Sequence, residues 1–340
     1  IAGAMSALNS GEYVQASARL AASDLHRGTW EHGFLSRMAR QSVSILRAPG
    51  GMILDLAAHP SETLFVTCDD RGGVSLWSPS GASPISTVSV SENARATAAC
   101  FDSSGSRVLV GTSDGFVHVL NGWDLVPVGE PIVVAAPVRD LAALPDGRIA
   151  IAHGAAEPAW WGGPAPPWPS PQPLGVESLA VSPDGRWFAT ADGAGEILIR
   201  DGGTHQPAAA VRFPGSVNQM RFDPSGARLA AVGGSSSVLV WSVPDGEVVY
   251  ELEPTTRATT VRSLDFSSDG RMLAVGLIHR GIVMFDLRTG ERLGDYNGHS
   301  DAVTATLFRD GDRVLLSASL DGSIRIWRLS ELGRPGGVSS

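Results

Sequence analysis

Short apolar segments alternate with polar turns along most of the chain. The segments are four to six residues long and rich in Val, Ile, Leu and Ala, as residues 261–266, 272–276 and 282–285 illustrate. Apolar runs of this length between turns of Gly, Pro, Asp and Ser predict β-strands. Apolar side chains fall on both faces of these strands, so we expect sheets that are covered by neighbours on both sides.

The predicted strands belong to a repeat. A turn of the type Ser-Pro-Asp-Gly recurs at intervals of 38 to 44 residues, and its seven copies end at residues 62, 105, 147, 185, 226, 270 and 312. Each unit has one segment before this turn and three after it, which predicts a four-stranded antiparallel meander. Internal repeats of this length are typical of propellers and solenoids. The seven units fill residues 43–330.

The last unit contains the most informative residues. Gly298-His299, Ser317-Ala-Ser319, Asp321-Gly322 and Ile324-Arg-Ile-Trp327 resemble one complete WD40 repeat. Other units keep parts of it, as in Val74-Ser-Leu-Trp77 and Val238-Leu-Val-Trp241. The resemblance covers about 290 of the 340 residues. It implies an all-β, seven-bladed WD40 β-propeller with a short N-terminal helical segment.

The two ends of the repeat region suggest how the ring closes. The seventh unit stops after its third strand, at Trp327, and a lone strand-like segment, residues 43–47, precedes the first unit. In WD40 propellers an N-terminal strand usually completes the last blade, and the resemblance implies the same here. Such closure removes the exposed sheet edges that invite aggregation.

Residues 1–42 differ from the repeat and predict a helical connector. Thr29 is suited to cap a helix whose apolar face contains Trp30, Phe34 and Met38. The run from Gly11 to Leu35 resembles the connector before WD40 propellers in large bacterial signalling proteins such as Ser/Thr protein kinases. The implied kinase domain would lie upstream of Ile1, and we expect the chain to be a fragment or a processed product. The alternative is a helical plug that packs on the propeller. Residues 331–340 predict a flexible tail.

The third unit is degenerate. Residues 157–173 contain seven Pro and three Trp, and proline cannot donate a hydrogen bond to a sheet, so most of this stretch cannot be central strand. In one interpretation, Trp160 and Trp161 form the third strand of the blade, with an irregular outer edge beyond them. In the other, the stretch is an exposed polyproline ligand for an aromatic groove.

The composition excludes several functions. All 26 basic residues are Arg, so the chain has no lysine for a P-loop, a Schiff base or a kinase ATP site. The net charge of −9 argues against binding to nucleic acid or anionic lipid, and no run of 18 apolar residues predicts membrane insertion. Cys68 and Cys100 have no His partners at ligand spacing, so we expect no metal site and no cofactor, and both cysteines are interpreted as small core residues.

The candidate catalytic residues lack the sequence context that catalysis requires. Gly111-Thr-Ser-Asp-Gly115 matches the string of a nucleophile elbow, but a strand follows it where the elbow needs a helix, so we do not expect Ser113 to be catalytic. Convergent carboxylates at the channel mouth are expected to be too few for an enzyme. We therefore predict no catalytic residue in this chain.

The resemblance implies a structural role for a second polar set. His299, Asp321, Trp327 and either Ser317 or Ser319 look superficially like a catalytic group. In WD40 repeats such residues form a buried hydrogen-bond network, and a network of this kind is costly to break once it is buried.

The candidate binding residues come from aligning the first strand of every unit on its apolar lead residue. The next residues are Leu54, Thr97, Arg139, Glu177, Asn218, Arg262 and Thr304. In WD40 proteins these positions lie near one rim of the channel, and Arg is favoured where partners bind tightly. We expect the six polar members to bind a protein partner. The alternative is that they only solvate the channel mouth, or that the arginines pair with Glu177.

The resulting interpretation is a monomeric, cytoplasmic, non-catalytic module for protein–protein interaction or scaffolding, the sensory or scaffolding part of a larger bacterial signalling protein. A propeller that senses a small ligand in its channel is one alternative, and a propeller enzyme is another.

Overall fold

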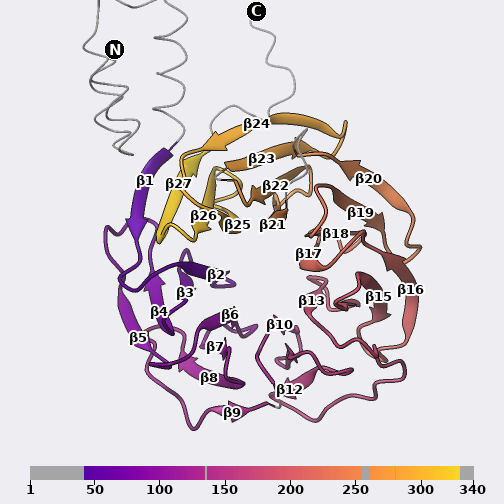
Figure 1. Cartoon of the computed structure of the whole chain (residues 1–340), viewed down its shortest axis with the longest axis horizontal. Coiled ribbons are helices and arrows are strands. Elements are labelled where there is room, and N and C mark those ends of the chain that lie inside the picture. Colours follow the sequence, from indigo (N-terminus) through magenta and orange to yellow (C-terminus); the bar gives the residue numbers. More distant parts are fainter. Residues whose placement is uncertain (1–41, 135, 255–259, 280, 330–340) are drawn as a thin grey trace, which may run out of the picture.

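The computed structural model describes residues 42–134, 136–254, 260–279 and 281–329, and these contain 27 strands. The strands form seven antiparallel sheets arranged around a common centre, six with four strands and one with three (Figure 1). The prediction of a seven-bladed, all-β propeller is therefore confirmed. The predicted helical connector (residues 1–42) and the predicted tail (residues 331–340) lie outside the described residues, except for Ser42, which begins β1.

The blades follow one another in sequence. Blade one contains β2 (Ile53–Ala58), β3 (Phe65–Asp69), β4 (Gly73–Trp77) and β5 (Ser86–Ser89). Blade two contains β6 (Ala96–Phe101), β7 (Arg107–Thr112), β8 (Phe116–Asn121) and β9 (Ile132–Val133). Blade three contains β10 (Asp140–Ala143), β11 (Ile149–Ala152) and β12 (Ala159–Trp161). Blade four contains β13 (Ser178–Val181), β14 (Trp187–Ala191), β15 (Glu196–Asp201) and β16 (Pro207–Arg212). Blade five contains β17 (Val217–Phe222), β18 (Arg228–Gly233), β19 (Val238–Ser242) and β20 (Val248–Leu252). Blade six contains β21 (Val261–Phe266), β22 (Met272–Leu277), β23 (Gly281–Asp286) and β24 (Glu291–Asn297). Blade seven contains β25 (Val303–Arg309), β26 (Val314–Ser319), β27 (Ser323–Arg328) and the first strand of the chain, β1 (Ser42–Arg47).

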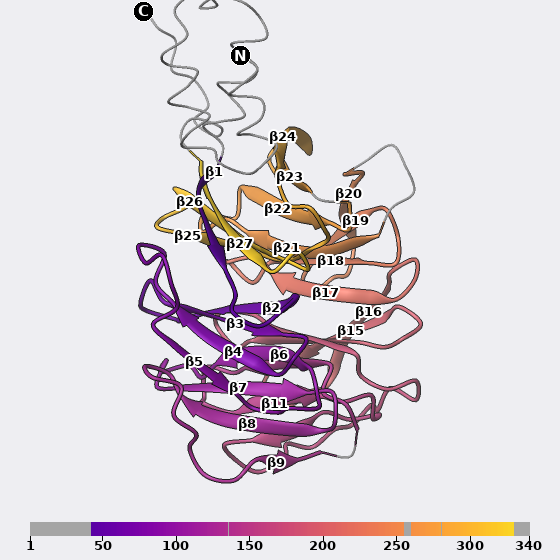
Figure 2. The same cartoon turned by 60° about the vertical axis from the view of Figure 1, so that its left-hand side comes forward.

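Blade seven joins the two ends of the ring. Strand β1 pairs antiparallel with β27, and Ile45 lies opposite Arg325 (Figure 2). Leu46 is buried in a cluster that also contains Ile324 and Ile326. Strand β1 thus covers the outer edge of β27.

The apolar core lies between the blades. Trp77, Trp241 and Trp327 are fully buried, and each belongs to the third strand of its blade. Each of the three packs in a cluster with residues of the preceding blade. Burial of a large apolar side chain stabilises a protein by about 1.5–3 kcal/mol. Stability is therefore distributed around the ring, in the contacts between neighbouring sheets.

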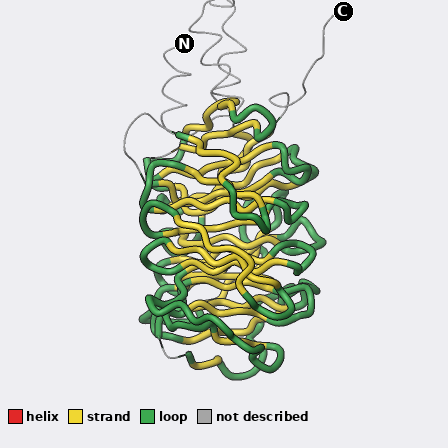
Figure 3. The backbone as a smooth tube through the Cα atoms, turned by 90° about the vertical axis from the view of Figure 1, so that its right-hand side faces the viewer, coloured by secondary structure: helices red, strands yellow, loops and turns green. Residues whose placement is uncertain are grey.

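Loops project from both faces of the ring, while the strands stack between them (Figure 3). The first strands of the blades contact one another around the centre. Side chains at the start of these strands therefore meet at one mouth of the channel. Among the described residues, no helix is long and apolar enough to cross a membrane.

The two adjacent tryptophans of the degenerate unit lie in a strand, as one of the two interpretations predicted. Trp160 and Trp161 lie in β12, which pairs with β11, and Trp160 is opposite Ala150. The rest of the proline-rich stretch contributes no fourth strand to blade three in the described part of the chain. Cys68 is buried in the core between blades one and two, and Cys100 is half-buried beside the channel.

Candidate interaction site at the channel mouth

Five of the six predicted rim residues line one cavity of about 210 Å³ at the mouth of the channel. The five are Thr97, Arg139, Asn218, Arg262 and Thr304. The sixth, Glu177, is in contact with Arg139 at the edge of this cavity. The arrangement of the inner strands around the channel thus brings together residues that lie more than 200 positions apart in the sequence.

Three rim residues connect neighbouring blades. The Thr97 hydroxyl donates to the backbone oxygen of Val138 at 2.8 Å, and the Thr304 hydroxyl donates to the backbone oxygen of Ile53 at 2.9 Å. The Asn218 amide donates to the backbone oxygen of Val261 at 3.0 Å. In each case the acceptor is the lead residue of the next blade. These three side chains therefore have a structural function at the rim.

The remaining rim residues are charged. Arg139 and Glu177 form an ion pair across blades three and four, with an Nε–Oε2 distance of 3.2 Å and side chains that are 53% and 32% exposed. Exposed pairs of this kind contribute little to stability. Arg262 is half-buried and forms no hydrogen bond or ion pair with any residue that the structure describes. Arg262 and the exposed pair are the rim groups available to a partner.

A second layer of connecting side chains lies one position deeper. Asp55 accepts a hydrogen bond from the backbone N–H of Ala99 at 2.9 Å, and Asp140 accepts one from Leu179 at 2.8 Å. Gln219 accepts one from Leu264 at 2.8 Å. Again, each donor belongs to the next blade. The sequence analysis missed this layer, although a polar residue two positions after the apolar lead residue is a signal that could have found it.

The channel also contains Asp265 and Arg221. Asp265 accepts a hydrogen bond from the N–H of Phe308 at 2.8 Å, and both side chains line a wider cavity of about 360 Å³ that continues the channel. Asp55 and Asp140 line the cavity at the channel mouth, and Asp265 lines the wider one; the sequence analysis did not place these three carboxylates in the channel. Each carboxylate is nevertheless bound to backbone N–H groups of a neighbouring blade.

Burial controls the ionisation of these carboxyl groups. Desolvation raises the pKa of Asp55 and of Asp265 to about 6 and also raises the pKa of Asp140, while Arg221 lowers all three through its charge. Within the described residues, no group of three or more His, Cys, Asp or Glu side chains is arranged to hold a metal ion.

The polar set of the last unit forms a connected network. The His299 ring donates from Nδ1 to Asp321 at 3.0 Å and accepts at Nε2 from the Ser317 hydroxyl at 2.7 Å. The Trp327 indole donates to the same hydroxyl at 2.8 Å. Ser317 therefore fills the position that the sequence left open between two serines, while the Ser319 hydroxyl donates to the backbone oxygen of Asp301.

Ser323 is a further member of this network that the sequence analysis did not identify. Its hydroxyl donates to Asp321 Oδ1 at 2.5 Å. Burial opposes ionisation of Asp321, but hydrogen bonds from His299 and Ser323 hold the pKa of this carboxyl well below its usual range. Burial lowers the pKa of His299, so the imidazole is neutral at pH 7. A neutral ring with its proton on Nδ1 satisfies every hydrogen bond of the set.

The string Gly111–Gly115 belongs to an ordinary turn. It joins β7 to β8, and the Ser113 hydroxyl accepts a hydrogen bond from the N–H of Arg95 at 3.0 Å. A strand–turn–strand context does not expose a serine as a nucleophile elbow does.

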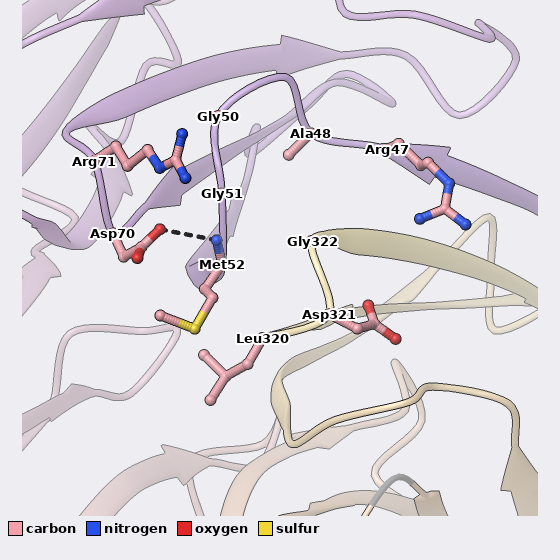
Figure 4. Close-up of a pocket in the computed structure, with 10 residues that line it drawn as sticks. All are labelled: Arg47, Ala48, Gly50, Gly51, Met52, Asp70, Arg71, Leu320, Asp321 and Gly322. Carbon is pink, nitrogen blue, oxygen red and sulfur yellow. Dashed lines mark hydrogen bonds between the residues drawn. The ribbon is translucent and has the colours of Figure 1, made fainter.

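A third cavity, of about 420 Å³, lies where the ring closes (Figure 4). Its walls come from the segment between β1 and β2, from the β3–β4 turn with Asp70 and Arg71, and from the β26–β27 turn with Asp321. Asp70 fixes the first of these segments by accepting a hydrogen bond from the N–H of Met52 at 2.8 Å. Met52 lines this cavity, and Leu54, two residues further along the chain, lines the cavity at the channel mouth.

Comparison with known proteins agrees with this architecture. The model for the WD domain, G-beta repeat, matches residues 40–78, 171–201, 210–242 and 290–328. The chain is thus a seven-bladed β-propeller built with WD40 repeats.

Three relatives show how far the similarity extends. Telomerase protein component 1 of Mus musculus is 26% identical over 323 residues, which are 90% of this chain and 12% of that protein. WD repeat-containing protein VIP3 of Arabidopsis thaliana is 32% identical over 158 residues, 42% of this chain and 49% of the relative. Protein ROOT INITIATION DEFECTIVE 3, also of Arabidopsis thaliana, is 35% identical over 108 residues, 31% of this chain and 23% of the relative. The chain therefore spans only part of each relative, and all three are eukaryotic proteins.

Proposed function

We propose that the propeller is a non-catalytic scaffold that binds a protein partner at the channel mouth, through Arg262 and the Arg139–Glu177 pair. The observation that carries the proposal is that some rim side chains are hydrogen-bonded to a neighbouring blade and others are not. Thr97, Asn218 and Thr304 are held by neighbouring blades, whereas Arg262 is unpaired among the described residues. WD40 propellers generally bind proteins, and arginine is enriched among residues that dominate binding energy.

The two layers of connecting side chains support this role through rigidity. Each layer joins inner strands of adjacent blades, so the rim keeps its shape before a partner arrives. A preorganised surface loses less conformational entropy on binding. The same bonds support a non-catalytic function, because the channel carboxylates already accept backbone hydrogen bonds.

The test is the double substitution Arg139→Ala with Arg262→Ala. Partners that co-purify with the native chain are identified, purified and titrated against the variants. We expect the double variant to keep its melting temperature, because neither side chain holds the fold together, and to bind the partner at least about tenfold more weakly. Arg288→Ala with Arg292→Ala is the matched control, since both arginines are exposed in blade six. Unchanged affinity in the rim variant would move the site away from the mouth.

A small ligand in the channel is a second candidate function. The wider cavity of about 360 Å³ contains Arg221, Asp265 and Gln219, and ligand sites of about 300–1,000 Å³ with a few polar groups are common. A ligand bound there would raise the melting temperature, and the rise would continue with the logarithm of the ligand concentration above the dissociation constant. Loss of that shift in Arg221→Met would assign the ligand to the channel.

We further propose that the propeller serves a larger bacterial signalling protein. The resemblance of residues 11–35 to the connectors of such proteins supports this proposal. The reading frame upstream of Ile1 tests it directly, and a frame that encodes neither a kinase nor another signalling domain would contradict it.

A further inference from the structure

The proline-rich segment between blades three and four has an unusually restricted backbone. We call residues 163–173 the proline strap. Every residue of the strap either is proline or directly precedes one. Proline has a φ angle near −65°, and the residue before a proline is pushed out of the helical region into extended conformations. The strap therefore has little conformational freedom to lose when a partner binds.

Blade four holds the strap in place. The guanidinium of Arg200 lies 4.3 Å from the centroid of the Trp168 ring, and its Nη2 donates to the backbone oxygen of Ser170 at 2.5 Å. Trp168 also packs edge-on against Phe188, with ring centroids 5.9 Å apart. Further along, the buried Gln172 side chain donates to the backbone oxygen of Glu196 at 3.1 Å.

The residue that anchors the strap, Arg200, departs from the pattern of the repeat. Arg200 occupies the position in β15 at which blades one, five and seven have a buried tryptophan. Its side chain is fully buried, and besides Ser170 it donates to the backbone oxygen of His205 at 3.1 Å. Desolvation lowers the pKa of Arg200 to about 10, so the group is still cationic at neutral pH. A buried cation requires compensation, and the strap supplies a carbonyl and an aromatic face.

The other side of the strap faces solvent. Pro164, Ala165, Pro167, Pro169 and Pro171 are exposed. Pro164 and Pro167 are three residues apart, which is one turn of a polyproline II helix and the spacing of the P-x-x-P recognition motif. The strap follows β12, which Figure 1 shows farther from the centre than β10. Residues 164–167 come soon after this outer strand, and none of them lines the cavity at the channel mouth.

We propose that residues 164–167 are a docking ligand for a partner domain with an aromatic-lined groove that recognises polyproline II segments. Such grooves take prolines of the P-x-x-P pattern in an extended conformation. In the free chain residues 164–168 contain no bend or turn, and Trp168 and Gln172 anchor the strap on blade four, so binding needs little further ordering. The interpretations of this stretch as a structural edge and as a ligand are compatible: Trp168 and Gln172 fasten the strap, and the exposed prolines remain available.

The test uses the complete chain and a panel of purified, isotope-labelled SH3 and WW domains. Binding is followed by chemical-shift changes in the labelled domain. We expect saturable binding to at least one domain of the panel, through the residues of its aromatic groove. Pro164→Ala with Pro167→Ala should weaken that binding at least about tenfold. Both prolines are exposed, so an unchanged melting temperature shows that the variant is folded.

Two controls decide the outcome. Pro60→Ala with Pro127→Ala removes two exposed prolines from other blades and should leave binding unchanged. The rim variant Arg139→Ala with Arg262→Ala should also bind normally, which separates this proposal from the proposed function. The proposal is overturned if no domain of the panel binds, or if binding survives loss of Pro164 and Pro167. Loss of binding in either control variant would also overturn it.

Discussion

Replacement of His299 by alanine tests whether the polar network of the last blade is structural. The carboxylate of Asp321 accepts four hydrogen bonds: one from His299, two from Ser323 and one from the backbone of Ser300. Three of these remain in His299→Ala, so the carboxylate stays largely satisfied. The Ser317 hydroxyl, in contrast, loses the acceptor for its proton while the Trp327 indole still donates to it.

The expected loss of stability follows from these hydrogen bonds. One buried donor left without an acceptor costs about 1–3 kcal/mol of unfolding free energy. We expect His299→Ala to lower stability by that amount, measured by urea unfolding at pH 7.5. The slope of the free energy against urea should remain the same, because the surface exposed on unfolding hardly changes.

Ser317→Ala and Ser319→Ala are matched controls for this prediction. Ser317 joins His299 to Trp327, so its substitution should be strongly non-additive with His299→Ala. The Ser319 hydroxyl contacts only backbone atoms in the described network and should be closer to additive. A His299→Ala variant that kept full stability but lost partner binding would contradict this prediction, since the residue would then have a functional role and no structural one.

Three further predictions concern closure, charge and the strap. Deletion of residues 1–47 removes the strand paired with β27, and we expect aggregation or a large drop in melting temperature; a chain starting at Ala48 that stays monomeric and equally stable would contradict this. The folded-state pKa of Asp55 and of Asp265 is raised to about 6 from 3.8, so the native state binds more protons than the unfolded state between these values. The native chain should therefore gain stability relative to Asp55→Asn with Asp265→Asn as pH falls from 6 to 4, and parallel pH profiles of the two proteins would refute the assignment. Trp168→Ala leaves the buried Arg200 without its aromatic face and should cost about 3 kcal/mol in urea unfolding, whereas Trp123→Ala, at a site 49% exposed, should cost clearly less.

Local patterns predicted the architecture because the information that specifies a blade is short-range. The turn period counts the blades, and runs of apolar residues between turns mark their strands. Trp160 and Trp161 illustrate this: one of the two interpretations of the proline-rich stretch placed them in the third strand of blade three, and they lie in β12.

The hydrogen bonds of the candidate site could be identified only from the tertiary structure, because they cross from one blade to the next. Thr97 meets the oxygen of Val138, 41 residues away, and Thr304 meets the oxygen of Ile53 at the opposite end of the ring. The aligned sequence places all rim residues at one level of the channel but does not distinguish a side chain that is bound to a neighbouring blade from one that is free. Only the closed ring separates Arg262 from Asn218.

Arg200 shows the same limit within a single blade. From the sequence it is a deviation at a position where other blades have tryptophan, and an arginine in a strand is usually exposed. The fold buries it because Trp168 and Ser170 of the proline strap lie over it. The sequence alone thus determines the number of blades, their strands and the candidate rim. Which polar groups are satisfied depends on contacts between neighbouring blades, whose partners are 41 residues apart for Thr97 and Val138 and 251 residues apart for Thr304 and Ile53. These contacts exist only in the folded structure.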